Sequence, residues 1–499
     1  MPLPPAQDLL PVLPELTLVI GACIILVAAI FAASTRRLSA VLCLLTVIAA
    51  GLLSLFLPAE LSRPTFGGMI QIDGFTHVAR LVILFAILAA TVVSLLHALP
   101  TAVSSQSLAD RTNPPEYFLL LLGAGCGLCL LASSTNLLVL FMAMELASLP
   151  SYVLAGWRKT TRFAAEASLK YVLIGSVAAA LFAFGSSVLF VCYNTLDVAE
   201  IARSTTVAPV PLAMIGVWAI AAGIAFKIAA VPMHFWCPDV FQGATADIGL
   251  FLSTASKAAA LTAAARLAIV SLPALPDGIL HTAALAMLAT AAVITMTVAN
   301  LAALSTTSLK RLAGWSSIAH AGYMLTVLVL AEHAPELRKT LTAYLAIYLV
   351  MNTGLFAGIA ALEAFESSDS LDRLRNLARF HPVLAASLAT CIVSLIGIPP
   401  TAGFTAKLLV LLALPAVGPI GWILAAALVL NTVLSLAYYL PLLRRMYLSD
   451  GYVDPSPPNE PSLALASAAR PSIFICFASA CSLILMFIFQ GLLLPWLPL

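Results

Sequence analysis

Four lysines and one glutamate lie inside long apolar stretches of this sequence, where charged side chains are difficult to accommodate. They are Lys170, Lys227, Lys257, Lys407 and Glu145. On insertion scales an ionisable group at mid-membrane costs about 2.5–3.5 kcal/mol, so such groups generally mark functional sites. A desolvated lysine gives up its proton readily. A row of such lysines, with gaps that water can fill, is what proton transfer through a membrane requires.

Two of these residues also have simpler interpretations, and two histidines join the candidate set. Lys170 lies only about five residues from the start of its stretch and could reach the polar boundary by snorkelling. Glu145 could serve only as a structural partner of one lysine. His234 and His320 could bridge gaps in the row, because imidazole both donates and accepts hydrogen bonds near neutral pH. Either histidine could instead be an ordinary buried one.

The composition places this row of residues in a membrane protein. The chain has 499 residues, of which 62% are hydrophobic and 9% charged, and its mean hydropathy is +1.06. Soluble domains carry about 25% charged residues. The net charge of +2 and the lack of a basic run argue against a nucleic-acid partner.

The apolar stretches predict about fourteen membrane spans, each needing about 20 residues. Their expected starts lie near residues 12, 38, 78, 116, 135, 166, 210, 243, 279, 311, 338, 383, 419 and 470. Lys and Arg are concentrated in the connections after odd-numbered spans, which predicts that these connections are cytoplasmic and that both termini are not. The N-terminus lacks the basic segment of a signal peptide, so we expect the first stretch to remain as a span.

Prolines predict that two of the spans are broken. Pro232 follows Lys227 in the seventh span, and Pro399 and Pro400 precede Lys407 in the twelfth. Proline removes a backbone donor and breaks a helix, and freed backbone groups at membrane depth need protein or a watery cavity around them. A plain kink is the alternative at either site.

The reversed order of lysine and proline, five spans apart, predicts two inverted five-helix repeats within an all-α polytopic membrane protein. We expect one membrane domain over 1–499. It would contain three N-terminal helices (1–112), the two repeats (113–275 and 276–448), and a linker with the last helix (449–499).

The nine cysteines are scattered, and only Cys126 and Cys129 have a spacing typical of metal ligands. No second pair and no nearby histidine accompany them, so we expect small apolar helix residues rather than a metal site. The sequence has no Gly-rich phosphate loop, no paired Cys motifs for iron–sulfur clusters and no soluble domain for a flavin or NADH. It predicts no cofactor in this chain.

Six motifs in order carry a resemblance to a known family. They are MELASLPSYVLAGW, AEASLKYVLIGS, GIAFKIAAVPMHFWCPDVFQGA, STASKAAAL, LKRLAGWSSIAHAGY and GIPPTAGFTAK. With them the chain resembles the antiporter-like membrane subunits of bacterial respiratory complex I, the proton-pumping NADH:quinone oxidoreductase, and among them the subunit N family. That family is similar to the membrane subunits of multisubunit cation/proton antiporters. The resemblance covers most of the chain and is most specific over 116–325 and 390–410.

The resemblance implies a fourteen-helix antiporter-like fold with broken seventh and twelfth helices, in the bacterial cell inner membrane. It implies that this subunit moves protons, driven by NADH-to-quinone electron transfer in partner subunits. Those partners would hold the flavin, the iron–sulfur clusters and the quinone, and would include homologous antiporter-like subunits of the membrane arm.

The resemblance also gives each candidate residue a place on the path. It matches Glu145 to the family's fifth-helix glutamate, Lys227 to its seventh-helix partner, Lys170 to the sixth-helix lysine, Lys257 to the central eighth-helix lysine, Lys407 to the lysine toward the far exit, and His234 and His320 to histidines beside the path.

Two departures and three alternatives accompany the resemblance. Residues 243–247 read Gly-Ala-Thr-Ala-Asp, where the family has a proline-rich stretch, and Cys237 stands where the family has threonine. The loop after the seventh helix is therefore the part least predictable from the family. The alternatives are a cation/proton antiporter subunit without redox chemistry, a photosynthetic version of the complex fed by another donor, and a membrane scaffold that carries the charges passively.

Overall fold

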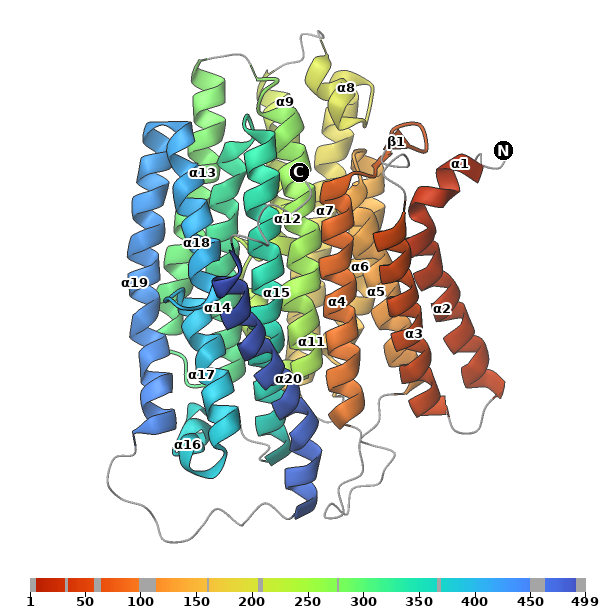
Figure 1. The fold of residues 1–499 in the computed structure, drawn as a ribbon. Helices are drawn as coiled ribbons and strands as arrows, with labels where there is room; N and C mark the ends of the chain where they lie inside the picture. Colours follow the sequence, from red (N-terminus) through yellow and green to blue (C-terminus); the bar gives the residue numbers. More distant parts are fainter. Residues whose placement is uncertain are drawn as a thin grey trace.

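The chain folds into a bundle of membrane-length helices (Figure 1). The structure is a computed structural model that describes residues 6–31, 35–57, 64–97, 114–158, 161–204, 210–275, 278–365, 369–448 and 463–490. Most of the predicted linker, residues 449–462, lies outside the described residues.

The N-terminal part contains three long helices, a short helical lead-in and a small hairpin. Its elements are α1 (Ala6–Leu9), η1 (Leu10–Val12), α2 (Leu13–Phe31), α3 (Thr35–Phe56), β1 (Pro64–Thr65), β2 (Ile70–Gln71) and α4 (Gly74–His97). The hairpin docks on the connection that precedes the fifth span, where the Thr135 N–H donates to the Met69 carbonyl at 3.0 Å.

Spans four to eight follow, and two of them are composite. Their elements are α5 (Pro115–Ser133), α6 (Leu137–Ala155), α7 (Arg162–Tyr193), α8 (Val198–Arg203), α9 (Val210–Ile228), α10 (Trp236–Gly243), α11 (Ala246–Phe251), the π-helical turn η4 (Leu252–Ser256) and α12 (Lys257–Ser271).

Spans nine to thirteen and the last helix complete the bundle. Their elements are α13 (Ile279–Ala303), α14 (Leu309–Leu325), η5 (Thr326–Leu330), α15 (Ala334–Phe365), η6 (Leu371–Leu374), α16 (Leu377–Phe380), α17 (Pro382–Ile396), α18 (Ala402–Ala413), η7 (Leu414–Val417), α19 (Pro419–Tyr447) and α20 (Leu463–Ile488).

The predicted number of spans agrees with the structure once the broken helix is counted. Among the described residues, 13 helices are long and apolar enough to cross a membrane. The remaining predicted span, the twelfth, consists of two shorter apolar helices, 382–396 and 402–417. Neither half meets the length criterion alone, because the proline-containing break divides it.

The seventh span is broken between α9 and α10, as Pro232 predicts. Ala229 has a left-handed φ of 62°, and the peptide between Val231 and Pro232 is cis. The Val231 N–H, which has left the helix, donates to Thr295 Oγ1 at 3.1 Å. The Thr295 side chain of α13 thus supplies the hydrogen-bond acceptor that this backbone N–H would lack in lipid.

The twelfth span is broken in the same manner between α17 and α18. Gly397 ends α17 with a φ of 85°, and Pro399 and Pro400 occupy the break. The Gly403 N–H at the start of α18 donates to Ser394 Oγ at 3.0 Å. The two halves are therefore held together across the break.

The first repeat contains a characteristic link between its connections. The Leu137 N–H, at the start of the fifth span, donates to the Leu196 carbonyl at 2.9 Å. The Val198 N–H donates back to the Thr135 carbonyl at 3.2 Å. The short helix α8 begins at this link.

The second repeat contains the same link five spans later. The Leu309 N–H donates to the Asp369 carbonyl and the Leu371 N–H donates to the Thr307 carbonyl, both at 3.0 Å. The short helix η6 begins here, just as α8 does in the first repeat. Five spans separate the links, so they lie at opposite ends of the bundle, and Figure 1 shows α8 at the top and α16, next to η6, at the bottom. Such a pair of links is expected of an inverted repeat.

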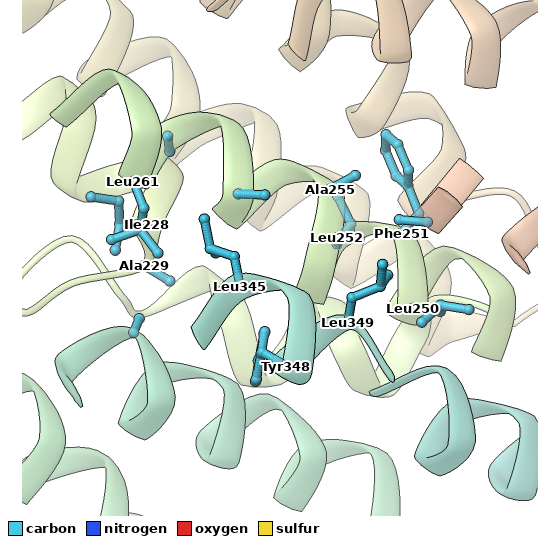
Figure 2. Packing of buried hydrophobic residues seen from close by; sticks show 14 of the residues in the cluster. Ile228, Ala229, Leu250, Phe251, Leu252, Ala255, Leu261, Leu345, Tyr348 and Leu349 are labelled. Atoms are coloured by element: carbon cyan, nitrogen blue, oxygen red, sulfur yellow. The ribbon is translucent and has the colours of Figure 1, made fainter. Parts of the chain in front are cut away.

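Two of the spans that carry candidate residues, the eighth with Lys257 and the tenth with His320, lie at the centre of the bundle. The most apolar stretch of the eighth span is 100% buried and that of the tenth 94%, compared with 28% for the first span. Figure 2 shows Leu345 and Leu349 of α15 packed in one cluster with Ile228 and Ala229 from the seventh-span break. Polar side chains on these central helices cannot reach lipid.

Candidate functional site

Lys227 lies in the last turn of α9, immediately before the break. Its side chain is buried, with the residue 2% exposed, and no described residue forms a hydrogen bond with its Nζ. The lysine lines a small, mostly apolar cavity together with Met144, Phe182 and Ala263. Lys227 is the only residue with a polar side chain among those that line this cavity.

Glu145 lies on α6 within electrostatic range of Lys227, but the two do not form an ion pair among the described contacts. Glu145 is half-buried, whereas Lys227 is enclosed. The direct contact that we expect from the cost of two isolated charges is therefore absent in this conformation.

Lys257 is the first residue of α12, directly after the π-helical turn. It is 1% exposed, and its Nζ donates to the Ser317 carbonyl on α14. π-Helical turns are rare and frequent at functional sites. Here the turn sets the direction in which Lys257 leaves its helix, toward α14.

Hydroxyl groups and an imidazole continue from Lys257 into the second repeat. Tyr348 Oη of α15 donates to Ser317 Oγ at 3.0 Å. His320 Nδ1 lies 2.9 Å from Tyr344 Oη. These groups can hold and relay protons, because each hydroxyl donates and accepts.

Lys407 lies on α18, just beyond the twelfth-span break, and is 5% exposed. Its Nζ donates to the Ile396 carbonyl at 2.9 Å and lies 3.3 Å from Thr432 Oγ1 of α19. The same ammonium lies 4.4 Å from the centroid of the Tyr323 ring. The broken end of α17 therefore supplies a backbone carbonyl to Lys407.

Lys170 lies apart from this buried row. Its side chain is 40% exposed and forms ion pairs with Glu166 at 2.6 Å and Asp239 at 2.5 Å. Asp239 on α10 also pairs with Arg311 at 3.0 Å. Of the two interpretations of Lys170, this placement favours a lysine that reaches the boundary.

His234 lies within the seventh-span break and is 5% exposed. Its ring centroid is 4.4 Å from Phe235 and 5.8 Å from Trp315, and its Nδ1 has no described hydrogen-bond partner. The structure thus brings His234 against α14 but not into contact with a lysine of the row.

The loop that departs from the family pattern is ordered and mostly buried. Asp247, in the first turn of α11, is 5% exposed and accepts a hydrogen bond from Tyr117 Oη at 2.6 Å. Lys310 Nζ donates to the Ala244 carbonyl at 3.0 Å. Cys237 is buried, with its sulfur 3.8 Å from the Gly314 carbonyl. These contacts join α5, α10, α11 and α14.

Tyr344 and Tyr348, which hydrogen-bond His320 and Ser317, were not among the predicted residues, although the sequence contained a signal for them. Tyr344, Tyr348 and Asn352 recur every four residues on α15, which aligns them on one helix face. Polar groups on one face of a long apolar helix indicate a polar interior. The Ser317 carbonyl, which accepts the hydrogen bond from Lys257, could not be predicted in this way. Every residue has a backbone carbonyl, and only the fold decides which one a side chain reaches.

Comparison with known proteins gives a consistent result. The family model described as "NADH:quinone oxidoreductase/Mrp antiporter, TM" matches residues 134–435. The chain is 34% identical to NADH-quinone oxidoreductase subunit N of Desulfovibrio desulfuricans, covering 99% of this chain and 97% of that protein. It is 35% identical to subunit N of Anaeromyxobacter sp., covering 89% and 88%.

Solved structures share the fold. A chain of respiratory complex I from Thermus thermophilus superposes with a TM-score of 0.76 at 29% identity, covering 97% of this chain and 99% of that one. A chain of the Mrp complex from Dietzia sp. superposes with a TM-score of 0.79 at 18% identity, covering 98% and 96%. Since the family model covers most of the chain and the relatives match it nearly end to end, the chain belongs to the NADH:quinone oxidoreductase/Mrp antiporter family of transmembrane subunits.

Proposed function

We propose that this chain is the antiporter-like, proton-translocating membrane subunit of an NADH:quinone oxidoreductase. The relatives at 34% and 35% identity that match it nearly end to end are named as subunit N of that enzyme, which supports this proposal over a cation/proton antiporter. The likeness to the Mrp chain, at 18% identity, concerns the fold alone.

One observation carries the proposal: three lysines are enclosed in the bundle without a carboxylate in ion-pair contact. Lys227, Lys257 and Lys407 are 2%, 1% and 5% exposed, and none forms an ion pair with another described residue. A permanently charged, unpaired lysine in this environment would be strongly destabilising. Lysines that change protonation state in use account for the arrangement.

The path that we propose runs from Glu145 and Lys227 through Lys257 and His320 to Lys407. Glu145 modulates the charge on Lys227 through their electrostatic interaction, without a direct contact. Lys257 passes its proton toward His320, which takes it on one ring nitrogen and releases it from the other.

Two further residues have supporting places in this scheme. We propose that Lys170, with its ion pairs to Glu166 and Asp239, acts at the boundary rather than inside the row. His234 would line the break beside α14.

The remaining assignments follow from this role. We propose that electron transfer takes place in partner subunits that hold the flavin, the iron–sulfur clusters and the quinone, and that this chain holds none of them. The complex would lie in the bacterial inner membrane beside homologous antiporter-like subunits, with both termini of this chain on the non-cytoplasmic side.

The proposal is tested with Glu145→Gln and Lys227→Met in membrane vesicles. Both variants should assemble, as judged by a native gel, but pump fewer protons, as followed with a pH-sensitive dye. NADH oxidation linked to quinone should fall with pumping, whereas assays with artificial acceptors should be spared. Wild-type pumping at wild-type turnover in both variants would leave these residues a structural role.

A further inference from the structure

The aromatic ring beside Lys407 is itself held by a neighbouring helix. Tyr323 of α14 is 1% exposed, and its ring lies 4.4 Å from the Lys407 ammonium. That distance is within the range in which the face of a ring attracts a cation. The hydroxyl of Tyr323 accepts a hydrogen bond from Asn300 Nδ2 of α13 at 3.0 Å.

Asn300 forms hydrogen bonds inside the bundle with both its amide nitrogen and its amide oxygen. It is 0% exposed. Besides Tyr323, its Nδ2 lies 3.1 Å from Asn431 Oδ1 and 3.2 Å from the Asn431 carbonyl, and its Oδ1 accepts from Tyr438 Oη at 3.1 Å. An amide offers two hydrogens and an acceptor oxygen, so its nitrogen and its oxygen are both engaged, with three acceptors sharing the two hydrogens.

The partner amide is equally fixed. Asn431 Nδ2 of α19 donates to Thr297 Oγ1 of α13 at 3.1 Å and to the Ala427 carbonyl at 3.0 Å. The paired asparagines therefore join α13, α14 and α19. A buried polar network whose members are all satisfied is rigid, and it specifies one arrangement of its side chains.

We propose that Asn300 is a positioning residue for proton transfer at Lys407, acting through Tyr323. Asn300 anchors the Tyr323 hydroxyl, and the anchored ring supplies one of the contacts that fix the Lys407 ammonium, beside the Ile396 carbonyl and Thr432. The proposal rests on the proposed function, in which Lys407 carries protons. It adds a side chain that touches neither the proton nor the lysine.

The test uses Asn300→Leu, Tyr323→Phe, the double variant and Lys407→Met in the assembled complex. Asn300→Leu should lower the pumping rate by about threefold, the effect of losing one contact to a cation. Tyr323→Phe, which keeps the ring but loses the hydroxyl, should have a similar effect. Because both changes break the same link, the double variant should be no worse than either single one.

A pH profile separates positioning from general destabilisation. The titratable groups that face Lys407 are His320 and Tyr323, and no described carboxylate pairs with it. Loss of the ring's attraction favours the neutral lysine, so the pH above which pumping declines should move lower in Asn300→Leu. Thr353→Val is the matched control, because the Thr353 hydroxyl is buried and bonds only the Leu349 carbonyl of its own helix.

The outcomes distinguish the two proposals. If Lys407→Met pumps like the wild type, the proposed function of Lys407 fails. If Lys407→Met loses pumping but Asn300→Leu retains it with an unchanged pH profile, only the positioning role is overturned. Losses that multiply in the double variant would also overturn it. Should Asn300→Leu fail to assemble, Tyr323→Phe carries the test through the same pH profile.

Discussion

The buried lysines differ in what surrounds each ammonium group. Lys257 and Lys407 donate to carbonyls of neighbouring helices, whereas Lys227 has no described partner and faces a cavity. Lys227 is thus the one of the three buried lysines whose Nζ has no described hydrogen-bond partner.

Lys170 provides a contrast at the same scale. Its side chain is 40% exposed, and ion pairs at exposed positions contribute only about 0.2–1 kcal/mol. We expect Lys170→Met to retain most of the pumping rate, whereas Lys227→Met loses it. Dye-monitored pumping in vesicles, normalised to assembled complex, measures both. A loss in Lys170→Met as deep as that in Lys227→Met would return Lys170 to the path.

The candidate residues were predictable from sequence to different degrees. A lysine within an apolar span, such as Lys257, can be recognised from the sequence alone, because the free-energy cost of placing its charge in the membrane depends on the residues of its own span. Of the two partners of Lys170, Glu166 lies four residues earlier on the same helix, whereas Asp239 was not visible because it lies 69 positions along the chain. Tyr344 and Tyr348 were missed because, in sequence, a tyrosine in an apolar helix cannot be told apart from an aromatic residue that only packs. Its role becomes visible when the structure shows the hydrogen-bond partner of its hydroxyl.

At the scale of elements, the two broken helices create the site. The breaks expose backbone carbonyls inside the bundle, and the second break supplies its Ile396 carbonyl to Lys407. Pro232 and Pro400 were sufficient to predict where the helices break. The sequence did not predict which groups accept hydrogen bonds from the backbone N–H groups at the two breaks. These acceptors are the Thr295 and Ser394 side chains, and only the packing of the helices brings them into reach.

Gly397 tests the second break. It has a φ of 85°, and a Cβ there would lie 2.9 Å from Lys407 Cδ. We expect Gly397→Ala to displace Lys407 and lower pumping, beyond the backbone cost of about 1–2 kcal/mol for a left-handed alanine. Gly418→Ala is the comparison for backbone strain without a side-chain clash, since Gly418 also has a positive φ, 70° with a ψ of −141°, and nothing lies within 4 Å of the added Cβ. Equal pumping by the two variants would show that only backbone strain matters.

A second element-scale feature is the ion pair that ties the N-terminal helices to the eighth span. Asp73, just before α4, accepts from Arg266 of α12 at 3.1 and 2.5 Å. Burial alone would raise the pKa of Asp73, but the charge and hydrogen bonds of Arg266, with those of Thr76, lower it overall. A carboxyl whose pKa is lowered by folding stabilises the fold above its unfolded value, and this contribution is lost as the pH falls through the folded value.

We therefore expect Asp73→Asn to destabilise the protein by about 3 kcal/mol at neutral pH, as when one partner of a buried pair is removed. The difference from the wild type should narrow as the pH falls below about 4, near the ordinary pKa of aspartate. Thermal unfolding in detergent at a series of pH values measures it. Asp372→Asn, at an exposed pair with Arg375, should change little. A pH-independent difference for Asp73→Asn would contradict the assignment.

At the scale of the whole molecule, the two repeats place equivalent breaks in opposite directions across the membrane. The matching links at Leu137 and Leu309 lie at opposite ends of the bundle (Figure 1). The row of polar groups crosses from the first repeat, which holds Lys227 and Lys257, to the second, which holds His320 and Lys407. The spans and the inverted order were predictable from hydropathy and proline position. The contact between the repeats, from Lys257 to Ser317, required the fold.

The measurement that tests the central claim most directly is NADH-driven proton pumping by Lys257→Met complex in sealed vesicles. Lys257 is the point at which the row passes from one repeat to the other, so no proton can follow the proposed path without it. We expect assembled complex, normal oxidation of NADH by artificial acceptors, and pumping reduced at least about tenfold, equivalent to about 1.4 kcal/mol of barrier. Wild-type pumping at wild-type quinone-linked turnover in this variant would contradict the account.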